Sequence, residues 1–337
     1  MKNFLRGLLG KHPEIDLERP WTQTFSPVTS RLDIYYFFRH ILGRLPQEAE
    51  WAGHCGFIGK GLNDVVATYL NSPEFKKREL LGFAPRGIQR VDLDRYAIYV
   101  ADNDHAVGSH ILAQRDYEPQ VSATFRAFLQ PGMAVVDIGA NIGWYSLLSA
   151  SLVGDQGRVY AFEPSPINSR FLLASKRANG FEQITLIHAA ASERIESLVY
   201  SSSFSNGFVT QPQDADPLQM FAADLVAALP VDLVVPPDQP IHLIKVDVEG
   251  WEMKALRGAM GVIERWKPRI VVEFSPPALE ACSGVSGDAF LEHFRALGYR
   301  FHVIGKSAPP QPGLGTAEVM AAYGAAQTNH IDILLVA

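Results

Sequence analysis

The sequence has little of several features that mark specialised classes of protein. Only two of its 337 residues are cysteines, Cys55 and Cys282. Neither has a His or Cys partner at metal-ligand spacing, which argues against a disulfide framework or a structural zinc site. Lysine and arginine number 30 against 36 aspartates and glutamates, a net charge of −6. Because there is no basic excess and no long basic run, no nucleic-acid-binding surface is expected.

Long hydrophobic runs are also missing. No stretch approaches the roughly 20 apolar residues that cross a bilayer, and Arg6 interrupts the apolar N-terminal residues, so no secretory signal is indicated. We therefore expect a soluble, cytoplasmic protein without a membrane span. The composition that remains is ordinary for a globular protein, with 47% hydrophobic and 20% charged residues, which is enough to bury a substantial core.

Composition divides the chain into regions of different character. A proline-containing polar lead-in is followed by a helical region, and then by a long region in which apolar runs alternate with helical patterns. The expected boundaries are 1–29 for the lead-in, 30–84 for an all-helical accessory domain and 85–337 for a larger α/β domain.

The helical region carries clear local signals but no chemistry. Leu62, Val65 and Tyr69 recur at helical spacing. Ser72 followed by Pro73 predicts a helix start, with the serine as N-cap and the proline at the first helical position. Nothing in this region groups residues for catalysis.

The larger domain alternates apolar runs with helical stretches, which predicts a mostly parallel sheet covered on both faces. The expected strands are 134–138, 158–162, 184–190, 242–246, 270–274, 300–303 and 331–336, with helices at 122–129, 166–179, 250–263 and 287–297. A hairpin over 96–100 and 110–113 is expected before the sheet, and a loop over 201–207. Ligands of such sheets bind outside the carboxyl ends of the strands.

Several of these strand ends carry acids. Asp137 ends the first strand and is followed by a turn holding Gly139 and Gly143, and Glu163 ends the second strand. This pattern is typical of a nucleoside site, in which a glycine turn lets the backbone approach the ligand and a carboxylate takes the ribose hydroxyls. Asn141 replaces the second glycine of the dinucleotide fingerprint, and an acid before the turn suits a cationic ligand better than a pyrophosphate. S-adenosylmethionine is therefore favoured over a nicotinamide cofactor.

Further acids follow later strands. Lys245, Asp247 and Glu249 lie at the end of the fourth strand, and Glu273 near the end of the fifth. A carboxylate here can help an acceptor hydroxyl become nucleophilic, so Asp247 is expected as base or acceptor positioner with support from Glu249, unless Lys245 neutralises one of them. Glu273 could complete the cluster. Such oxygen ligands would suit magnesium, but no pattern demands a metal and none is predicted.

The order of these motifs resembles the FkbM-type S-adenosylmethionine-dependent methyltransferases over roughly residues 90–337. The resemblance is carried by Tyr117–Pro119, Val136–Gly143, Phe162–Pro164, Ile244–Gly250 and Pro268–Glu273. It implies a seven-stranded Rossmann-like class I methyltransferase sheet whose last strand is antiparallel, and O-methylation of a hydroxyl on a glycan, a polyketide or another small natural product.

The resemblance also implies site residues. Gly139, Asn141 and Gly143 would line the methionine part of the cofactor, Glu163 would bind the ribose, and Ala190 would lie near the adenine. The expected cofactor-binding residues are thus Glu118, Asp137, Gly139, Asn141, Gly143, Glu163, Ala190 and Asp247, and the expected catalytic residues are Asp247, Glu249 and Glu273.

The accessory region resembles a short helical domain of unknown function that recurs in bacterial proteins, often beside glycan-processing or surface-associated modules. The segments that carry this resemblance are Phe38–Arg44 and Tyr69–Phe75. It implies a docking role toward a protein partner. Two rival functions stay open for the chain: a nicotinamide-dependent oxidoreductase, and a nucleoside-binding assembly module without catalysis.

Overall fold

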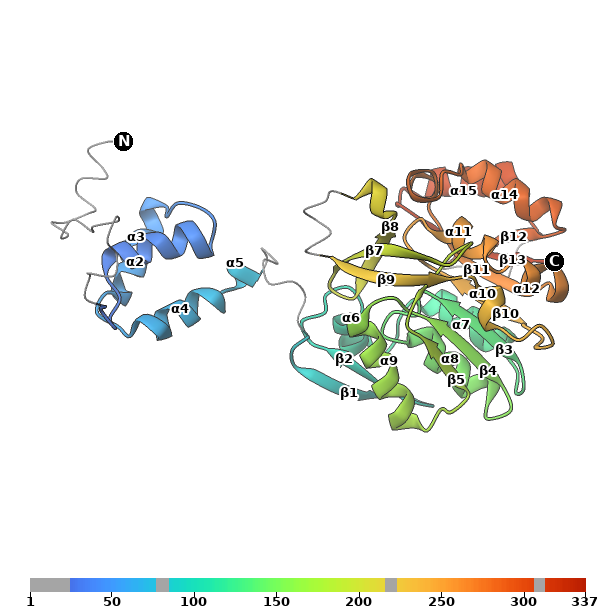
Figure 1. The fold of residues 1–337 in the computed structure, drawn as a ribbon, viewed down its shortest axis with the longest axis horizontal. Coiled ribbons are helices and arrows are strands. Elements are labelled where there is room, and N and C mark those ends of the chain that lie inside the picture. Colours follow the sequence, from blue (N-terminus) through green and yellow to red (C-terminus); the bar gives the residue numbers. More distant parts are fainter. Residues whose placement is uncertain (1–24, 77–84, 216–222, 306–312) are drawn as a thin grey trace. The chain divides into compact units, whose positions relative to one another are not determined.

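The computed structural model describes residues 25–76, 85–215, 223–305 and 313–337. The chain divides into two compact units, Met1–Gly82 and Phe83–Ala337 (Figure 1). Each unit has a hydrophobic core of its own. The first unit is helical and the second contains the sheets.

The N-terminal unit is a small helical bundle. Its elements are α2 (Arg31–Tyr36), which continues as the π-helix η2 (Phe37–Ile41), then α3 (Glu48–His54), the 3-10 helix η3 (Cys55–Phe57), α4 (Leu62–Leu70) and α5 (Pro73–Lys76). Ile34, Phe38, Val65 and Tyr69 form the centre of its core. The expected start of α5 is confirmed, since the Phe75 amide donates to the Ser72 hydroxyl at 3.1 Å.

An arginine joins two helices of this bundle. The Arg44 guanidinium donates from Nη2 to Glu50 of α3 and to Glu74 of α5, each at 2.9 Å. Its hydrogen bonds lower the pKa of Glu50 to about 2, because a carboxylate that accepts from a guanidinium is favoured in its charged form. These ion pairs thus join residues that lie 30 positions apart in the sequence.

Replacing Arg44 by methionine should therefore loosen α3 and α5. The substitution leaves two carboxylates facing one another without their shared donor. Hydrogen bonds to charged groups contribute about 1.5–3 kcal/mol, reduced by solvent at partly exposed sites. Backbone amides of Glu48–His54 and Glu74–Lys76 should therefore exchange about tenfold faster in the full chain. Arg31→Met, at an exposed position of α2, is the control. Equal exchange in both variants would show that the Arg44 pairs contribute nothing.

The larger unit is built on a seven-stranded mixed sheet. Its strands run in the order β12 (Arg300–Val303), β13 (Ile331–Val336), β11 (Arg269–Phe274), β10 (Leu243–Val246), β3 (Ala134–Ile138), β4 (Arg158–Phe162) and β5 (Ile184–Ile187). The strand β13 is antiparallel to both its neighbours, and the other pairs are parallel. The expected α/β class and antiparallel last strand are confirmed.

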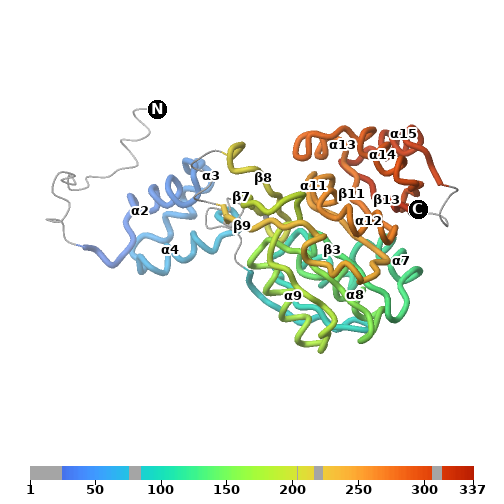
Figure 2. The backbone as a smooth tube through the Cα atoms, turned by 45° about the vertical axis from the view of Figure 1, so that its right-hand side comes forward, coloured from blue at the N-terminus to red at the C-terminus, as the bar shows by residue number. Residues whose placement is uncertain are grey.

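Helices cover both faces of this sheet (Figures 1 and 2). One face packs on α6 (Gly108–Gln114), α7 (Pro119–Phe128), α8 (Trp144–Val153) and α9 (Pro166–Asn179). The other face packs on α10 (Val231–Val234), α11 (Glu252–Arg257), α12 (Met260–Trp266), α14 (Gly287–Ala296) and α15 (Thr316–Ala326), with α13 (Pro276–Ala278) and the π-helix η6 (Leu279–Ser283) between β11 and α14. Strands buried on both faces explain the near-continuous apolar runs of the sequence.

Some expected elements differ in the structure. The segment 110–113 lies in helix α6, and the hairpin is instead formed by β1 (Ile88–Asp92) and β2 (Ala97–Ala101). The expected helix 250–263 is two helices, α11 and α12. The expected third strand ends at Ile187, and the residues beyond it enter a different sheet. Short apolar runs fit a strand or a buried helical turn equally well, which accounts for the first error.

A second, four-stranded sheet follows β5 in the chain. It is formed by β6 (Ala190–Ala191), β9 (Asp224–Leu229), β7 (Glu196–Ser203) and β8 (Asn206–Thr210), in that order. The expected loop 201–207 is therefore the turn of the β7–β8 hairpin, and η4 (Pro212–Asp214) follows it. The inner face of this sheet packs on Trp251, just after β10. This contact places the second sheet beside the carboxyl edge of the main sheet (Figure 1).

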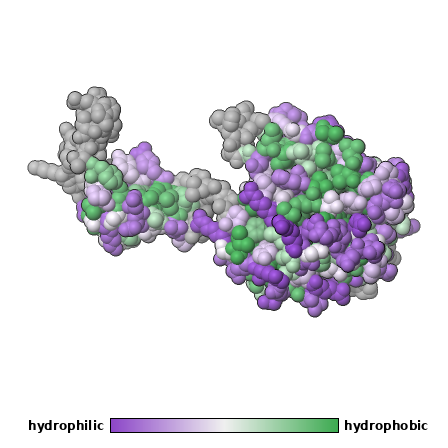
Figure 3. Space-filling model, turned by 60° about the horizontal axis from the view of Figure 1, so that its bottom comes forward, coloured by the Kyte–Doolittle hydropathy of each residue, from purple (hydrophilic) through white to green (hydrophobic). Residues whose placement is uncertain are grey.

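Hydrophobic residues also reach the surface of both units. Figure 3 shows hydrophobic areas on each of them, interspersed with hydrophilic ones. The exposed hydrophobic side chains include Phe25 and Leu45 of the first unit and Ile195 and Leu225 of the second. Scattered exposure of this kind is normal for folded proteins. Among the described residues, no helix has both the length and the apolar character needed to cross a membrane.

Candidate functional site

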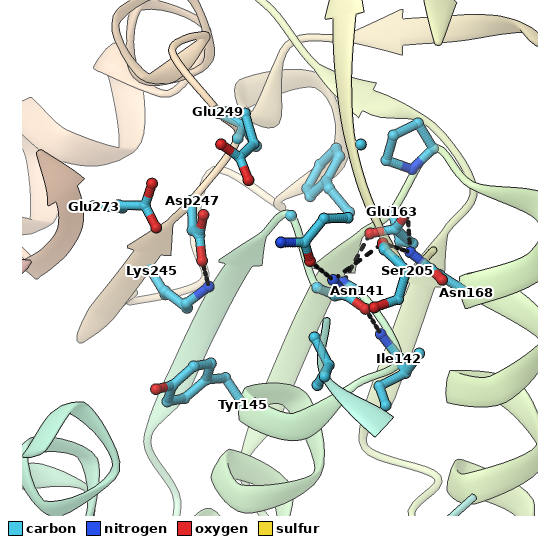
Figure 4. Close-up of a pocket in the computed structure, with 18 of the residues that line it drawn as sticks. Asn141, Ile142, Tyr145, Glu163, Asn168, Ser205, Lys245, Asp247, Glu249 and Glu273 are labelled. Carbon is cyan, nitrogen blue, oxygen red and sulfur yellow. Dashed lines mark hydrogen bonds and ion pairs between the residues drawn. The ribbon is translucent and has the colours of Figure 1, made fainter. Parts of the chain in front are cut away.

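A cavity lies at the carboxyl edge of the main sheet, with about 910 Å³ of space between atoms, open solvent included. The second sheet contributes one side of the cavity. Its main lining segments are Tyr117–Glu118, Gly139–Ile142, Phe162–Pro164, Ala190–Ala191, Ser205–Gly207, Asp247–Glu249, and the side chains of Lys245 and Glu273. Figure 4 shows the charged residues among them converging on one space.

The turn after β3 brings backbone to the cavity because its residues adopt positive φ angles. Gly139 has φ +79°, and a Cβ built on it would lie 2.0 Å from the Asp247 carbonyl oxygen, so only glycine fits between the turn and the end of β10. Asn141 follows with φ 52°. Gly143, at φ 101°, precedes the first residue of α8, and a Cβ there would meet Leu172. Gly143 shapes the turn but does not itself line the cavity.

Glu163, which follows the last residue of β4, faces this turn. One carboxylate oxygen accepts from the Asn141 amide at 2.7 Å, and the other accepts from the Ser165 amide at 2.8 Å and from the Asn168 side chain at 3.4 Å. The residue is only 3% exposed. Burial raises the pKa of Glu163 to about 7 despite these donors. The amides fix its carboxylate in one orientation, with lone pairs left for further donors.

Asp137 lies below the turn and not on the cavity wall. It is completely buried and accepts from the Ser146 hydroxyl at 2.6 Å. Burial raises the pKa of Asp137, and the charge of Lys245 opposes this effect. The position fits a role in orienting the turn and Lys245, and direct contact between Asp137 and a cofactor stays a prediction.

Three acids and one lysine form the far side of the cavity. Lys245 Nζ donates to Asp247 at 2.9 Å, so the lysine pairs with Asp247 and not with Glu249. Burial, followed by the charge of Asp247, raises the pKa of Glu249. Burial, with the charges of Asp247 and Glu249, raises the pKa of Glu273 to about 10. In Figure 4 the side chains of Glu249 and Glu273 lie on either side of Asp247.

Glu118 closes the cavity between these groups and α8. It has φ 42° immediately before Pro119, a backbone conformation that a residue before proline rarely adopts and that is typical of functional sites. The Tyr145 hydroxyl donates to its carboxylate at 2.6 Å. The ring of Tyr145 also lies 4.8 Å from Lys245 Nζ. Tyr145 thereby connects Glu118 with the Lys245–Asp247 pair.

The structure brings most of the expected site residues together around one cavity. Glu118, Gly139, Asn141, Glu163, Ala190, Asp247, Glu249 and Glu273 line it, whereas Asp137 and Gly143 do not. The predicted site residues did not include Tyr145, Asn168, Ser205 and Asn206, which also line it. No local pattern marks these polar residues, because each reaches the cavity through tertiary contacts.

Charge at this cavity favours a cationic ligand portion. Its described lining includes the acidic side chains of Glu118, Glu163, Asp247 and Glu249, against the paired Lys245, whereas the raised pKa of Glu273 keeps that side chain neutral at neutral pH. Within the described residues, no group of three or more His, Cys, Asp or Glu side chains is arranged to hold a metal ion.

Most of the region around this cavity matches a known family of proteins. Residues 137–301 match the family model described as the methyltransferase FkbM domain. Over 92 residues the chain is 30% identical to a protein-L-isoaspartate O-methyltransferase of Methanothermobacter thermautotrophicus, a match that covers 27% of this chain and 41% of that protein. The chain therefore spans less than half the length of this curated relative.

Solved structures of methyltransferases also align with this chain. The methyltransferase FkbM of Methylobacillus flagellatus is 16% identical, with a TM-score of 0.40 over 89% of this chain and 58% of that chain. The M. jannaschii TYW2 protein, solved in complex with AdoMet, is 11% identical, with a TM-score of 0.37 over 75% of this chain and 86% of that chain.

Proposed function

Because this chain carries a methyltransferase domain of the FkbM family at residues 137–301, we propose that it transfers a methyl group from S-adenosylmethionine to a hydroxyl oxygen of a glycan or small natural product. The observation that supports this most is the single cavity that joins the glycine turn and Glu163 at one end to Asp247, Glu249 and Glu273 at the other. The proposed donor site and the acids proposed to act on the acceptor would thus share one space.

The residues at the turn fit S-adenosylmethionine. Gly139 and Asn141 of this turn line the cavity, so the methionine part of the cofactor would lie against the turn. Glu163 would accept from both ribose hydroxyls, and the carboxylate of Glu118 would face the ammonium group of the methionine part. When bound, this cofactor supplies an electrophilic methyl group on a positively charged sulfur. The acidic lining suits that charge.

The acids on the far side would act on the acceptor. Asp247 is ion-paired with Lys245, and its carboxylate can position the acceptor by accepting a hydrogen bond from a second hydroxyl of it. Glu249 has a raised pKa and so binds a proton more readily, which suits it to take the hydroxyl proton as the oxygen attacks. Glu273, protonated at neutral pH, would donate a hydrogen bond to the acceptor. Holding the acceptor oxygen in line with the methyl group provides the orientation that direct displacement needs.

The pH dependence of the rate tests these roles. Glu249 acts as a base only when deprotonated, so kcat should rise with pH through an acid limb above the ordinary glutamate value of 4.5. Glu273 loses its proton near pH 10, and kcat should then fall because the donated hydrogen bond is lost and a negative charge is added. The charges that act on Glu273 are those of Asp247, Glu249, Glu252 and Lys245, and His330 Nδ1 lies 3.7 Å from its carboxyl group.

The variant Glu273→Gln should keep the acid limb and lose the alkaline fall, because glutamine resembles the protonated acid and does not ionise. The measurement is kcat against pH from 5 to about 10.5, a span that covers both limbs. Glu264→Gln, at an exposed position of α12, should keep both limbs. An unchanged alkaline fall in Glu273→Gln would rule out this role for Glu273.

The proposed reaction is tested by incubating the full chain with methyl-labelled S-adenosylmethionine and a panel of glycans, nucleotide sugars and hydroxylated natural products. Label should appear as a base-stable methyl ether on at least one acceptor. Label in an alkali-labile methyl ester would instead show transfer to a carboxylate. Donor binding without transfer to any acceptor would favour a nucleoside-binding assembly module.

We further propose that the Met1–Gly82 unit docks a protein partner of this enzyme.

A further inference from the structure

The turn of the β7–β8 hairpin is tied to a distant part of the chain. We call residues 204–206 the hairpin tip. Its Ser205 donates to the carboxylate of Asp104 from both the backbone amide, at 3.3 Å, and the hydroxyl, at 3.0 Å. Both residues are 2% exposed. The ring of Phe204 also meets the ring of His105 edge to face, with 5.1 Å between ring centroids.

Asp104 is itself rigidly held. Its carboxylate accepts from the Gly108 amide at 2.8 Å and from the Ala106 amide at 3.2 Å. Asp104 therefore presents a fixed acceptor to the hairpin tip. A buried carboxylate with several donors is a strong anchor because each of these hydrogen bonds is charge-assisted.

The other side of the hairpin tip contacts the donor end of the cavity. The Ser205 carbonyl accepts from Asn168 at 2.7 Å and from the Asn141 side chain at 3.2 Å. Asn141 also donates to Asn206 at 3.2 Å. These two asparagines, Asn141 and Asn168, in turn donate to Glu163. Figure 4 shows Ser205 beside Asn141, Asn168 and Glu163, so the tip covers the proposed ribose-binding carboxylate.

We propose that Asp104 is a positioning residue of the donor site, whose contact with Ser205 holds the hairpin tip closed over Glu163. The donor then reaches Glu163, and the spent donor leaves, when this contact opens. This inference rests on the proposed function, because it takes Glu163 as the residue that binds the ribose. It also explains the position of the second sheet, because β7 and β8 extend far enough to place the tip between Asp104 and Glu163.

The test measures how fast the full chain releases S-adenosylhomocysteine, followed by stopped-flow tryptophan fluorescence with Trp144 and Trp251 in the cavity wall. Asp104→Ala should release it about tenfold faster or more, because it removes two hydrogen bonds to a charged group. Ser205→Ala keeps the Gly108 contact of Asp104 and should show a smaller increase. Asp104→Asn, which can still bond to the Ser205 hydroxyl, should lie between Asp104→Ala and the unsubstituted chain. Ser197→Ala, exposed on β7, is the control.

A second readout separates closure from general loosening of the fold. Bound S-adenosylhomocysteine should protect the amides of β7 and β8 from hydrogen exchange in the unsubstituted chain, and this protection should be lost in Ser205→Ala while β3 and β4 stay protected. Unchanged release rates and protection in both Asp104→Ala and Ser205→Ala would overturn the inference and leave the proposed function intact. Failure of the unsubstituted chain to bind S-adenosylhomocysteine would overturn both.

Discussion

Substituting Glu163 by glutamine should weaken binding of S-adenosylhomocysteine by about 100-fold or more. The proposed carboxylate contacts to the two ribose hydroxyls are charge-assisted, each contributing about 1.5–3 kcal/mol, and every 1.4 kcal/mol is tenfold in affinity. Glutamine also turns an amide group toward the Asn141 or Ser165 amide, both of which donate to Glu163 in the structure. Two donors would then face one another.

Isothermal titration of the purified chain measures this effect. Glu182→Gln, at an exposed position after α9, is the matched control and should bind as the unsubstituted chain does. Thermal unfolding of both variants without ligand shows whether the fold is kept. If Glu163→Gln folds and binds S-adenosylhomocysteine with unchanged affinity, the ribose does not bind where we propose.

The second large effect concerns catalysis. Glu249→Gln should lower kcat about 10²–10⁴-fold, the usual contribution of a general base, and leave the affinity for S-adenosylhomocysteine within about twofold. Asp247→Asn should instead raise the KM of the acceptor, because a neutral amide holds the hydroxyl less strongly and leaves Lys245 without its ion pair. The two acids are thus distinguished by which kinetic constant changes.

These constants are measured on the acceptor that accepts labelled methyl most efficiently. Glu264→Gln again serves as the exposed carboxylate control. A loss of kcat in Asp247→Asn with normal kcat in Glu249→Gln would reverse the two roles. Full activity in both variants would remove these acids from the reaction and leave positioning of donor and acceptor as the source of catalysis.

The main sheet was predictable because its signals are local. Runs such as Ala134–Val136 and Val159–Phe162 are apolar, and helices with clear caps separate them from later runs, as at Ser165 and Gly180 around α9. Burial on both faces of the sheet requires this kind of sequence. The acids at the carboxyl ends of these strands meet because parallel strands end at the same edge.

The second sheet and the hairpin tip were not predictable in the same way. The segment 201–207 is rich in serine, which indicates a loop, and the sequence contains no sign that Ser205 meets Asp104 about a hundred residues earlier. The burial of Asp137 is a further example. Its position at a strand end gave no sign that the side chain would be completely buried and bonded to Ser146 of α8. Contacts of this kind depend on packing that no local pattern encodes.

The most direct test of the account is a calorimetric titration of the full chain with S-adenosylhomocysteine and, separately, with NADH. The account predicts saturable one-to-one binding of S-adenosylhomocysteine and no heat of binding with NADH. Binding of NADH at this cavity, or no binding of S-adenosylhomocysteine by folded protein, would contradict it.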